Sequence, residues 1–195
     1  TLVDTQGRGV DCITATGVMA QGREYELDCL IYASGFEVGT DYSRRADIQL
    51  LGCGGESLTQ KWASGVRTLH GMHVNGFPNC FIMSNAQAGF TANYPHLLDE
   101  QAKHIAYIIE TAGAKGCSRV EVTEQGEAGW VQRCIDRARD TGDFLENCTP
   151  GYYNNEGRTG DRSAQNGFYG GGSIEFFRLL GEWRAAGGLE GLALR

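Results

Sequence analysis

The stretch from Gly76 to Gln101 constrains the fold of this chain more than any other part of the sequence. It opens with a Gly-Phe-Pro-Asn turn, continues into an apolar run at 80–83, and crosses small and polar residues at 84–93 before a helical pattern begins. The apolar run predicts a buried strand. A strand that leads into a helix through such a loop gathers free backbone N–H groups at the positive end of the helix dipole. We therefore expect an electron-rich or anionic ligand at this loop.

The residues from Tyr94 to Thr111 give the clearest helical pattern in the chain, because apolar side chains recur at helical spacing. Pro95 falls in the first turn, where its missing N–H costs nothing. Thr91 or Asn93 is expected to cap the start. Gly113 is expected to end the helix.

Composition and charge exclude several classes of protein. The chain has 195 residues and a net charge of -7, whereas a nucleic-acid binder normally shows a basic face. No apolar run approaches the roughly 20 residues that cross a membrane, and the N-terminus lacks the apolar core of a signal peptide. The seven cysteines are odd in number and form no C-x-x-C pair, which favours reduced thiols and a cytoplasmic protein. Because the chain begins on Thr1 in what reads as mid-strand, we expect a missing N-terminal part of the same chain.

The first 36 residues are expected to form strands. Gly17–Met19 and Arg23–Leu27 flank Gln21-Gly22, a plausible hairpin turn. Leu30–Ala33 is continuously apolar, as in a parallel strand that is buried on both faces. Ser34-Gly35 ends it with small residues that let another group approach the backbone.

The remaining elements are predicted from periodicity and capping signals. They are a strand at 48–51, a helical turn at 58–63 with Trp62 packed inward, a strand or connector at 117–122, a helix at 127–139, a helix capped by Ser173 and ended by Gly187, and a final strand or extended tail at 189–194.

Two motifs resemble ligand sites but are better explained as loops. His70 and His73 would need a third metal ligand on a fixed scaffold, and Gly71 between them disfavours a helix. Exposed or hydrogen-bonded loop histidines are expected instead, and no metal. The run from Gly52 to Ser57 misses the last glycine of G-x-G-x-x-G, which favours a turn over a phosphate loop.

Four runs of residues carry a resemblance to a known family. Asp28-x-x-x-x-Ala-Ser-Gly-Phe resembles a motif of flavin-dependent monooxygenases with two dinucleotide domains, with Ser34 in place of Thr. The W-x-x-G-x-R-T run from Trp62, the Gly-Phe-Pro-Asn turn and the run from Gln87 to Gln101 resemble Baeyer–Villiger monooxygenases, in the form typical of enzymes for bulky cyclic or steroid-like ketones.

The resemblance implies an α/β fold: part of a two-dinucleotide-binding-domain flavoprotein, with the end of the NADP domain and the C-terminal half of the FAD domain. The implied domains are 1–36, the end of the nicotinamide-cofactor domain; 37–143, the C-terminal part of the FAD domain; 144–170, a mobile loop or lid; and 171–195, the C-terminal helix and strand.

The resemblance also implies which residues bind the cofactors FAD and NADP. It places two residues at the crossover to the flavin domain, two along the flavin ring, two with backbone N–H groups toward the pyrimidine edge, and three over the nicotinamide or the substrate. In that order they are Ser34 and Gly35; Ala86 and Gln87; Asn93 and Tyr94; and Tyr152, Tyr153 and Asn154. The segment of the fourth group departs from the family, because Cys148 stands where many members carry Trp.

The implied reaction uses FAD, NADPH and O2 to insert one oxygen atom into a ketone, which gives an ester or lactone. The G-x-G-x-x-G fingerprints are absent from the chain, and the family's catalytic Arg is expected upstream of Thr1. The chain is thus expected to hold no catalytic residue and to be inactive alone. Two alternatives stay open: an N- or S-oxygenating flavin monooxygenase, and a non-catalytic module with a degenerate cofactor site.

Overall fold

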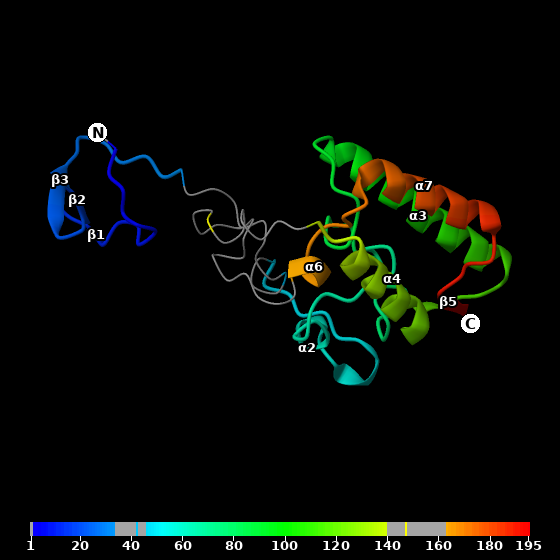
Figure 1. Ribbon diagram of the computed structural model, residues 1–195. Coiled ribbons are helices and arrows are strands. Elements are labelled where there is room, and N and C mark those ends of the chain that lie inside the picture. The colour runs from blue at the N-terminus through cyan, green and yellow to red at the C-terminus, as the bar shows by residue number, and fades with distance from the viewer. Residues whose placement is uncertain (1, 34–41, 43–45, 140–146, 148–162) are drawn as a thin grey trace. The chain divides into compact units, whose positions relative to one another are not determined.

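A computed structural model describes residues 2–33, 42, 46–139, 147 and 163–195 (Figure 1). The chain divides into two compact units: Thr1–Thr40 with Gly142–Thr159, and Asp41–Thr141 with Gly160–Arg195. Each unit is described by itself below. The assignment of these parts to nicotinamide and flavin domains stays a prediction.

The described part of the first unit is a three-stranded antiparallel sheet in the order β1-β2-β3. Its strands are β1 (Cys12–Ile13), β2 (Gly17–Ala20) and β3 (Arg23–Glu26). Gln21 and Gly22, between β2 and β3, both have positive φ, 54° and 73°, as a two-residue hairpin turn of the primed type requires. The predicted hairpin is confirmed, and β1 falls within the first 36 residues, which were expected to form strands, although no strand was predicted at Cys12–Ile13 itself.

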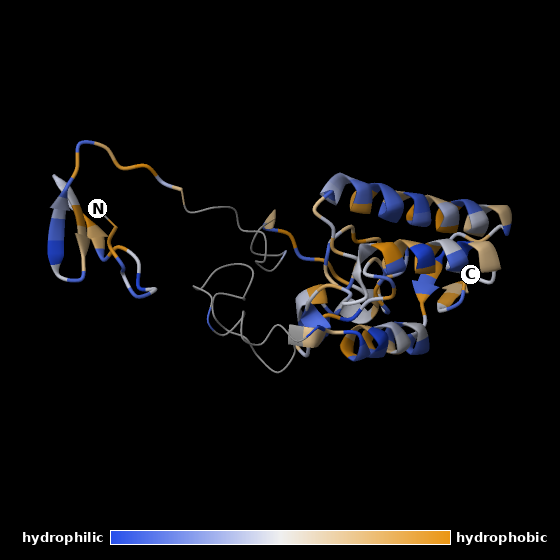
Figure 2. Cartoon of the chain, turned by 45° about the horizontal axis from the view of Figure 1, so that its top comes forward, coloured by the Kyte–Doolittle hydropathy of each residue, from blue (hydrophilic) through white to orange (hydrophobic). Residues whose placement is uncertain are grey.

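The predicted buried strand at Leu30–Ala33 is wrong. This segment pairs with no described residue, and its side chains are exposed: Ile31 is 82% and Tyr32 is 73% accessible. It appears as a hydrophobic stretch after β3 in Figure 2. A continuous apolar run becomes a buried strand only when strands flank it on both sides, and none of the described residues do so.

The described part of the second unit combines helices with a small antiparallel sheet. Its elements are η1 (Cys53–Gly55), α2 (Leu58–Lys61), α3 (Tyr94–Ala114), β4 (Val120–Val122), α4 (Glu124–Asp136), α6 (Ser163–Asn166), α7 (Gly172–Ala186) and β5 (Leu192–Leu194). β4 pairs with β5, which confirms the strands predicted at 117–122 and 189–194. α3 and α7 lie side by side, and the Tyr107 hydroxyl donates to the Arg184 carbonyl across them at 2.9 Å (Figure 1). None of the helices described is long and apolar enough to span a bilayer.

Three predicted helix boundaries shift in the structure. α3 runs through Gly113, because one glycine costs a helix only about 1 kcal/mol; the chain leaves the helix at Lys115 and turns at Gly116, where φ is 71°. α4 starts at Glu124, since the Thr123 hydroxyl accepts the Gly126 N–H and caps it there. α7 begins at Gly172 rather than being capped by Ser173.

Two further predicted strands do not form among the described residues. The run Cys80–Met83 makes a single backbone hydrogen bond to a neighbouring segment, from the Ile82 N–H to the Met72 carbonyl at 2.8 Å. Residues 48–51 contribute only one isolated bridge, between Leu51 and Ser57. Both strand predictions are wrong: Ile48, Leu51 and Met83 are exposed, and an apolar run forms a strand only where a partner strand in register completes the ladder.

The main core of the second unit lies between α3, α4 and α7. It contains Met72, Leu97, Trp130, Phe176 and Leu180, each at most 5% exposed. A second cluster joins the C-terminal half of α3 to the β4–β5 sheet. Figure 2 shows the helices of this unit with hydrophobic residues toward one another and hydrophilic residues on their outer faces. Because α3 packs into this core, the position of its N-terminal end, which follows the loop at 84–93, is fixed.

Two glycines of α4 give a matched test of this packing. A Cβ on Gly126 would lie 2.6 Å from the Gly191 Cα, whereas a Cβ on Gly129 meets nothing within 4 Å. We expect Gly126→Ala to lower the free energy of unfolding by about 1–3 kcal/mol, because backbone must move. Gly129→Ala should raise it by up to about 1 kcal/mol through helix propensity. Denaturant unfolding of both variants checks this, and equal effects would contradict the close approach of α4 to Gly191.

Candidate functional site

The loop at 84–93 delivers the chain to the open N-terminus of α3. Asn93 caps the helix, since its Oδ1 accepts the His96 N–H at 3.3 Å; of the two predicted caps, this is the one that forms. The N–H of Tyr94 donates to no atom that the structure describes. Asn93 and Tyr94 are exposed, and Ala86 is half-buried. The positive end of a 21-residue helix therefore opens to the surface beside small residues, which fits an electron-rich ring edge.

Gln87 lies in the same loop and turns its side chain inward. It is 0% exposed, and its Oε1 and Nε2 both bond to other segments of the second unit. Its backbone N–H donates to the Gly167 carbonyl at 2.8 Å, and its carbonyl accepts the Trp130 Nε1–H at 3.1 Å. Every polar atom of Gln87 is occupied, so a ligand on this loop would meet the neighbouring residues instead. The contacts of Ala86 and Gln87 with a flavin ring stay predictions.

The other predicted site residues lie outside the described residues. They are Ser34, Gly35, Tyr152, Tyr153 and Asn154. The structure brings together only Ala86, Gln87, Asn93 and Tyr94, all in one loop and the helix start that follows it.

A cluster of three buried histidines was not anticipated. His70, His73 and His104 are at most 8% exposed, although loop histidines were expected to be exposed or hydrogen-bonded. His70 Nδ1 lies 3.3 Å from His104 Nε2, so the hydrogen-bonded alternative holds for His70. His73 Nε2 and His104 Nδ1 have no partner among the described residues. A signal existed in the sequence: His104 stands between Gln101 and Ile108 on the stripe of α3 that faces the core.

Burial keeps these imidazoles neutral. Desolvation lowers the pKa of His70 to about 3, helped by the charges of His73 and Arg133. Desolvation alone lowers the pKa of His73 to about 4. The pKa of His104 falls to about 2, from desolvation and then from the charges of His70, His73 and Arg184.

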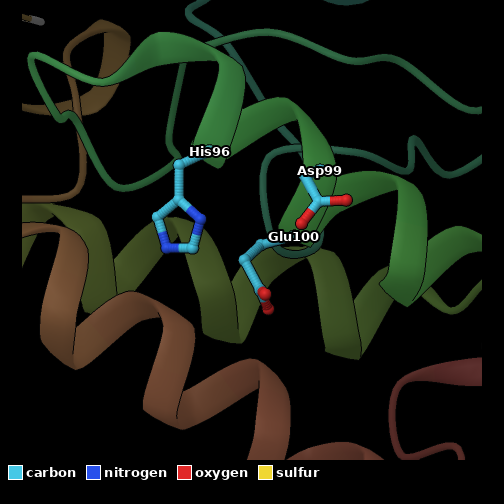
Figure 3. A group of neighbouring side chains, drawn as sticks. All are labelled: His96, Asp99 and Glu100. Atoms are coloured by element: carbon cyan, nitrogen blue, oxygen red, sulfur yellow. The ribbon is translucent and has the colours of Figure 1, made fainter.

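One group of possible metal ligands occurs elsewhere in the part of the chain that the structure describes. His96, Asp99 and Glu100 project from the first turns of α3 with ligand atoms within 4.8 Å of one another (Figure 3). Both carboxylates already have cationic partners: Lys103 Nζ lies 2.7 Å from Asp99 and 2.9 Å from Glu100, and Arg184 Nη2 lies 3.6 Å from Glu100. Three exposed or half-exposed groups on a single helix face do not amount to a metal centre.

The arginine of the W-x-x-G-x-R-T run takes part in a buried ion pair. Arg67 Nε lies 3.0 Å from Glu127 Oε2, and Lys61 Nζ lies 3.4 Å from the same oxygen. Glu127 is fully buried, and its Oε1 accepts the Asn75 N–H at 2.9 Å. The pair therefore fastens the segment at 61–75 to α4, a structural role for a motif that the sequence analysis used only for its resemblance.

The sequence and the structure of this chain were compared with those of known proteins. No family model matches the chain. Pentalenolactone D synthase of Streptomyces arenae is 51% identical over 197 residues, which cover 100% of this chain and 33% of that protein. Baeyer-Villiger monooxygenase ATR8 of Stachybotrys chlorohalonatus is 42% identical, with 100% of this chain and 31% of that protein covered. Among solved structures, a polycyclic ketone monooxygenase from Thermothelomyces thermophila superposes with a TM-score of 0.83 at 35% identity, over 100% of this chain and 32% of that one.

The fold is therefore part of a flavoprotein monooxygenase fold, as the sequence predicted. The relatives of this chain are Baeyer–Villiger and FAD-binding monooxygenases, and the chain corresponds to their C-terminal third. It spans about a third of the length of the curated relatives that it matches. A steroid monooxygenase with NADP bound is a further structural relative, with a TM-score of 0.77 at 26% identity over 100% of this chain and 35% of that one.

The histidine cluster predicts a steep dependence of stability on pH. The folded-state pKa values of the three histidines lie below the ordinary value of about 6.5. Between about pH 6.5 and pH 4 the unfolded state therefore binds more protons than the folded state. The contribution of the histidines to stability is complete above about pH 6.5 and is lost as the pH falls toward 4. Each histidine should contribute up to about 1.4 kcal/mol per pH unit. Denaturant unfolding of the protein from pH 7.5 to 5 measures this slope.

Two variants separate the cluster from the rest of the protein. His73→Asn removes one titrating group of the cluster, so the slope between pH 6.5 and 5 should fall by up to about 1.4 kcal/mol per pH unit. Val74→Ala, at a buried position that carries no titrating group, should lower stability at every pH and leave the slope unchanged. An unaltered slope in His73→Asn would contradict the neutral buried state.

Proposed function

We propose that this chain is the C-terminal part of an FAD- and NADPH-dependent Baeyer–Villiger monooxygenase, which inserts one oxygen atom of O2 into a ketone to give an ester or lactone. The observation that carries the proposal is the position of the exposed N-terminus of α3. The open N-terminus of α3, where the Tyr94 N–H donates to none of the described residues, follows the loop where the resemblance expects a flavin. The relatives that match the chain from end to end include a Baeyer–Villiger monooxygenase and a polycyclic ketone monooxygenase.

The chain's own residues would hold and orient the cofactor. FAD, when bound, supplies the redox chemistry: it accepts a hydride from NADPH and activates O2. The Tyr94 N–H and the helix dipole would orient the electron-rich edge of the ring, with Asn93 fixing the first turn of α3. Ala86, small and half-buried, would let the ring approach the loop backbone. The apolar core behind the loop would keep water from that side of the site.

The remaining site assignments belong to the same proposal. Ser34 and Gly35 would lie at the crossover from the NADP domain, and Tyr152, Tyr153 and Asn154 over the nicotinamide or the substrate. The catalytic Arg and both dinucleotide fingerprints would come from residues outside this chain, in a cytoplasmic enzyme. The substrate would be a bulky cyclic ketone, because a polycyclic ketone monooxygenase and a steroid monooxygenase are among its structural relatives.

The test uses the full-length protein that contains this chain. It should purify yellow with bound FAD and oxidise NADPH faster when a cyclic or polycyclic ketone is added, and mass spectrometry should find the product 16 Da heavier. Products oxygenated only on amines or sulfides would favour the N- or S-oxygenating alternative. Absence of FAD and of NADPH oxidation would favour the non-catalytic module and overturn the proposal.

This chain expressed alone gives a second prediction. It should neither retain FAD through gel filtration nor oxidise NADPH, because it supplies only one wall of the cofactor site. Absorbance at 450 nm and at 340 nm measures the two properties. Ketone-dependent NADPH oxidation by the isolated chain would show that the catalytic groups lie within it.

A further inference from the structure

The side-chain amide of Gln87 joins the loop at 84–93 to two segments that are distant in the sequence, one at 66–68 and one at Gln165. Its Oε1 accepts two hydrogen bonds from Thr68, from the backbone N–H at 3.1 Å and from Oγ1 at 2.7 Å. Its Nε2 donates to the carbonyls of Val66 at 2.8 Å and Gln165 at 2.9 Å. Since an N–H faces one end of the amide and two carbonyls face the other, only one orientation of the group satisfies all four bonds.

The backbone of Gln87 is held as firmly as its side chain. Its φ is 53°, a left-handed conformation that costs a residue other than glycine about 1 kcal/mol or more. Such a conformation persists where the surroundings determine it from several sides. Here the Gly167 carbonyl and the Trp130 indole hold the peptide groups on either side of the residue. The next residue continues the attachment, because the Ala88 carbonyl accepts the Tyr169 N–H at 2.9 Å.

The partners of Gln87 are themselves tied to one another. The Thr68 hydroxyl that donates to Gln87 also accepts the Gly71 N–H at 3.0 Å. Gln165 donates its own Nε2 to the Val66 carbonyl at 2.8 Å, and Asn166 accepts the Val66 N–H at 2.8 Å. The network is therefore closed, and Gln87 is the member that belongs to the loop at 84–93.

These contacts leave Gln87 no polar atom for a ligand. They attach the loop at 84–93 to the rest of the second unit, so the position of the loop depends on Gln87. Ala86 precedes it directly, and Asn93 and Tyr94 follow at the helix start. We propose that Gln87 is a positioning residue: its buried amide fixes the backbone of the loop at 84–93 at the distance from the flavin that oxygenation requires, without touching the flavin itself. This inference rests on the proposed function of the loop as one wall of the flavin site.

The test uses the full-length holoenzyme and the variant Gln87→Leu, which keeps a side chain of similar size and loses all four amide bonds. We expect FAD to stay bound, kcat with a cyclic ketone to fall on the order of 10- to 100-fold, and the KM for the ketone to change by less than about twofold. The share of NADPH oxidation that ends in hydrogen peroxide should rise. A residue needed only for stability would lower the yield and the FAD content without changing this share.

A second pair of variants keeps the test decisive if Gln87→Leu does not fold. Thr68→Val removes the hydroxyl from the network and keeps the volume, whereas Thr68→Ser keeps the hydroxyl. Thr68→Val should raise the peroxide share, and Thr68→Ser should restore the wild-type value. If Gln87→Leu folds, the double variant Gln87→Leu/Thr68→Val should be no worse than Gln87→Leu alone, because both act through one network.

The outcomes separate this inference from the proposed function. If the wild-type protein binds no FAD, or oxidises no NADPH with any ketone, the proposed function fails. If the wild-type protein is an active oxygenase and the Gln87 and Thr68 variants retain its kcat and peroxide share, the positioning role of Gln87 is overturned.

Discussion

The structure of the candidate site depends on one buried amide. The loop at 84–93 contains no regular element, so its shape cannot come from a hydrogen-bond ladder. It comes instead from Gln87, whose side chain and peptide groups bond to the segment at 66–68, to α4 and to the chain at 165–167. Burying an amide is costly unless each of its hydrogen-bonding atoms has a partner, and here each has one. A fully satisfied polar network of this kind specifies a single arrangement, because any shift of the loop would leave several buried groups unpaired.

The same unit buries other polar groups in ways that keep it free of uncompensated charge. Glu127 Oε2 lies 3.4 Å from Lys61 Nζ and 3.0 Å from Arg67 Nε, and this contact holds the segment at 61–75 against α4. Within the part of the chain that the structure describes, no carboxylate pairs with the three buried histidines, and burial holds them neutral. Glu127 and His104 belong to the packed helices α4 and α3, and α3 begins where the loop ends. Among the predicted site residues that the structure describes, those at the open end of α3 are the exposed ones.

The sequence was sufficient for elements whose signals are local, and insufficient for those that depend on distant partners. The hairpin at Gln21-Gly22 and the helix capped by Asn93 were predicted because turn chemistry and helical spacing are written in neighbouring residues. The strand at Leu30–Ala33 failed because an apolar run does not say whether strands flank it. The family was recognisable from short runs such as W-x-x-G-x-R-T, but the inward orientation of Gln87 was not. Its partners Thr68 and Gln165 lie 19 and 78 residues away, and nothing local marks them as a pair.

The most direct test of this account is a crystal structure of the full-length protein with FAD bound. The account predicts that the flavin ring lies against the backbone at Ala86 and the N-terminus of α3, with the Tyr94 N–H toward its pyrimidine edge. The Gln87 amide should still point away from the ring and bond to Thr68. A flavin ring bound elsewhere would contradict the claim that this loop lines the flavin site. A Gln87 side chain that contacts the ring would contradict the claim that Gln87 acts only by positioning the loop.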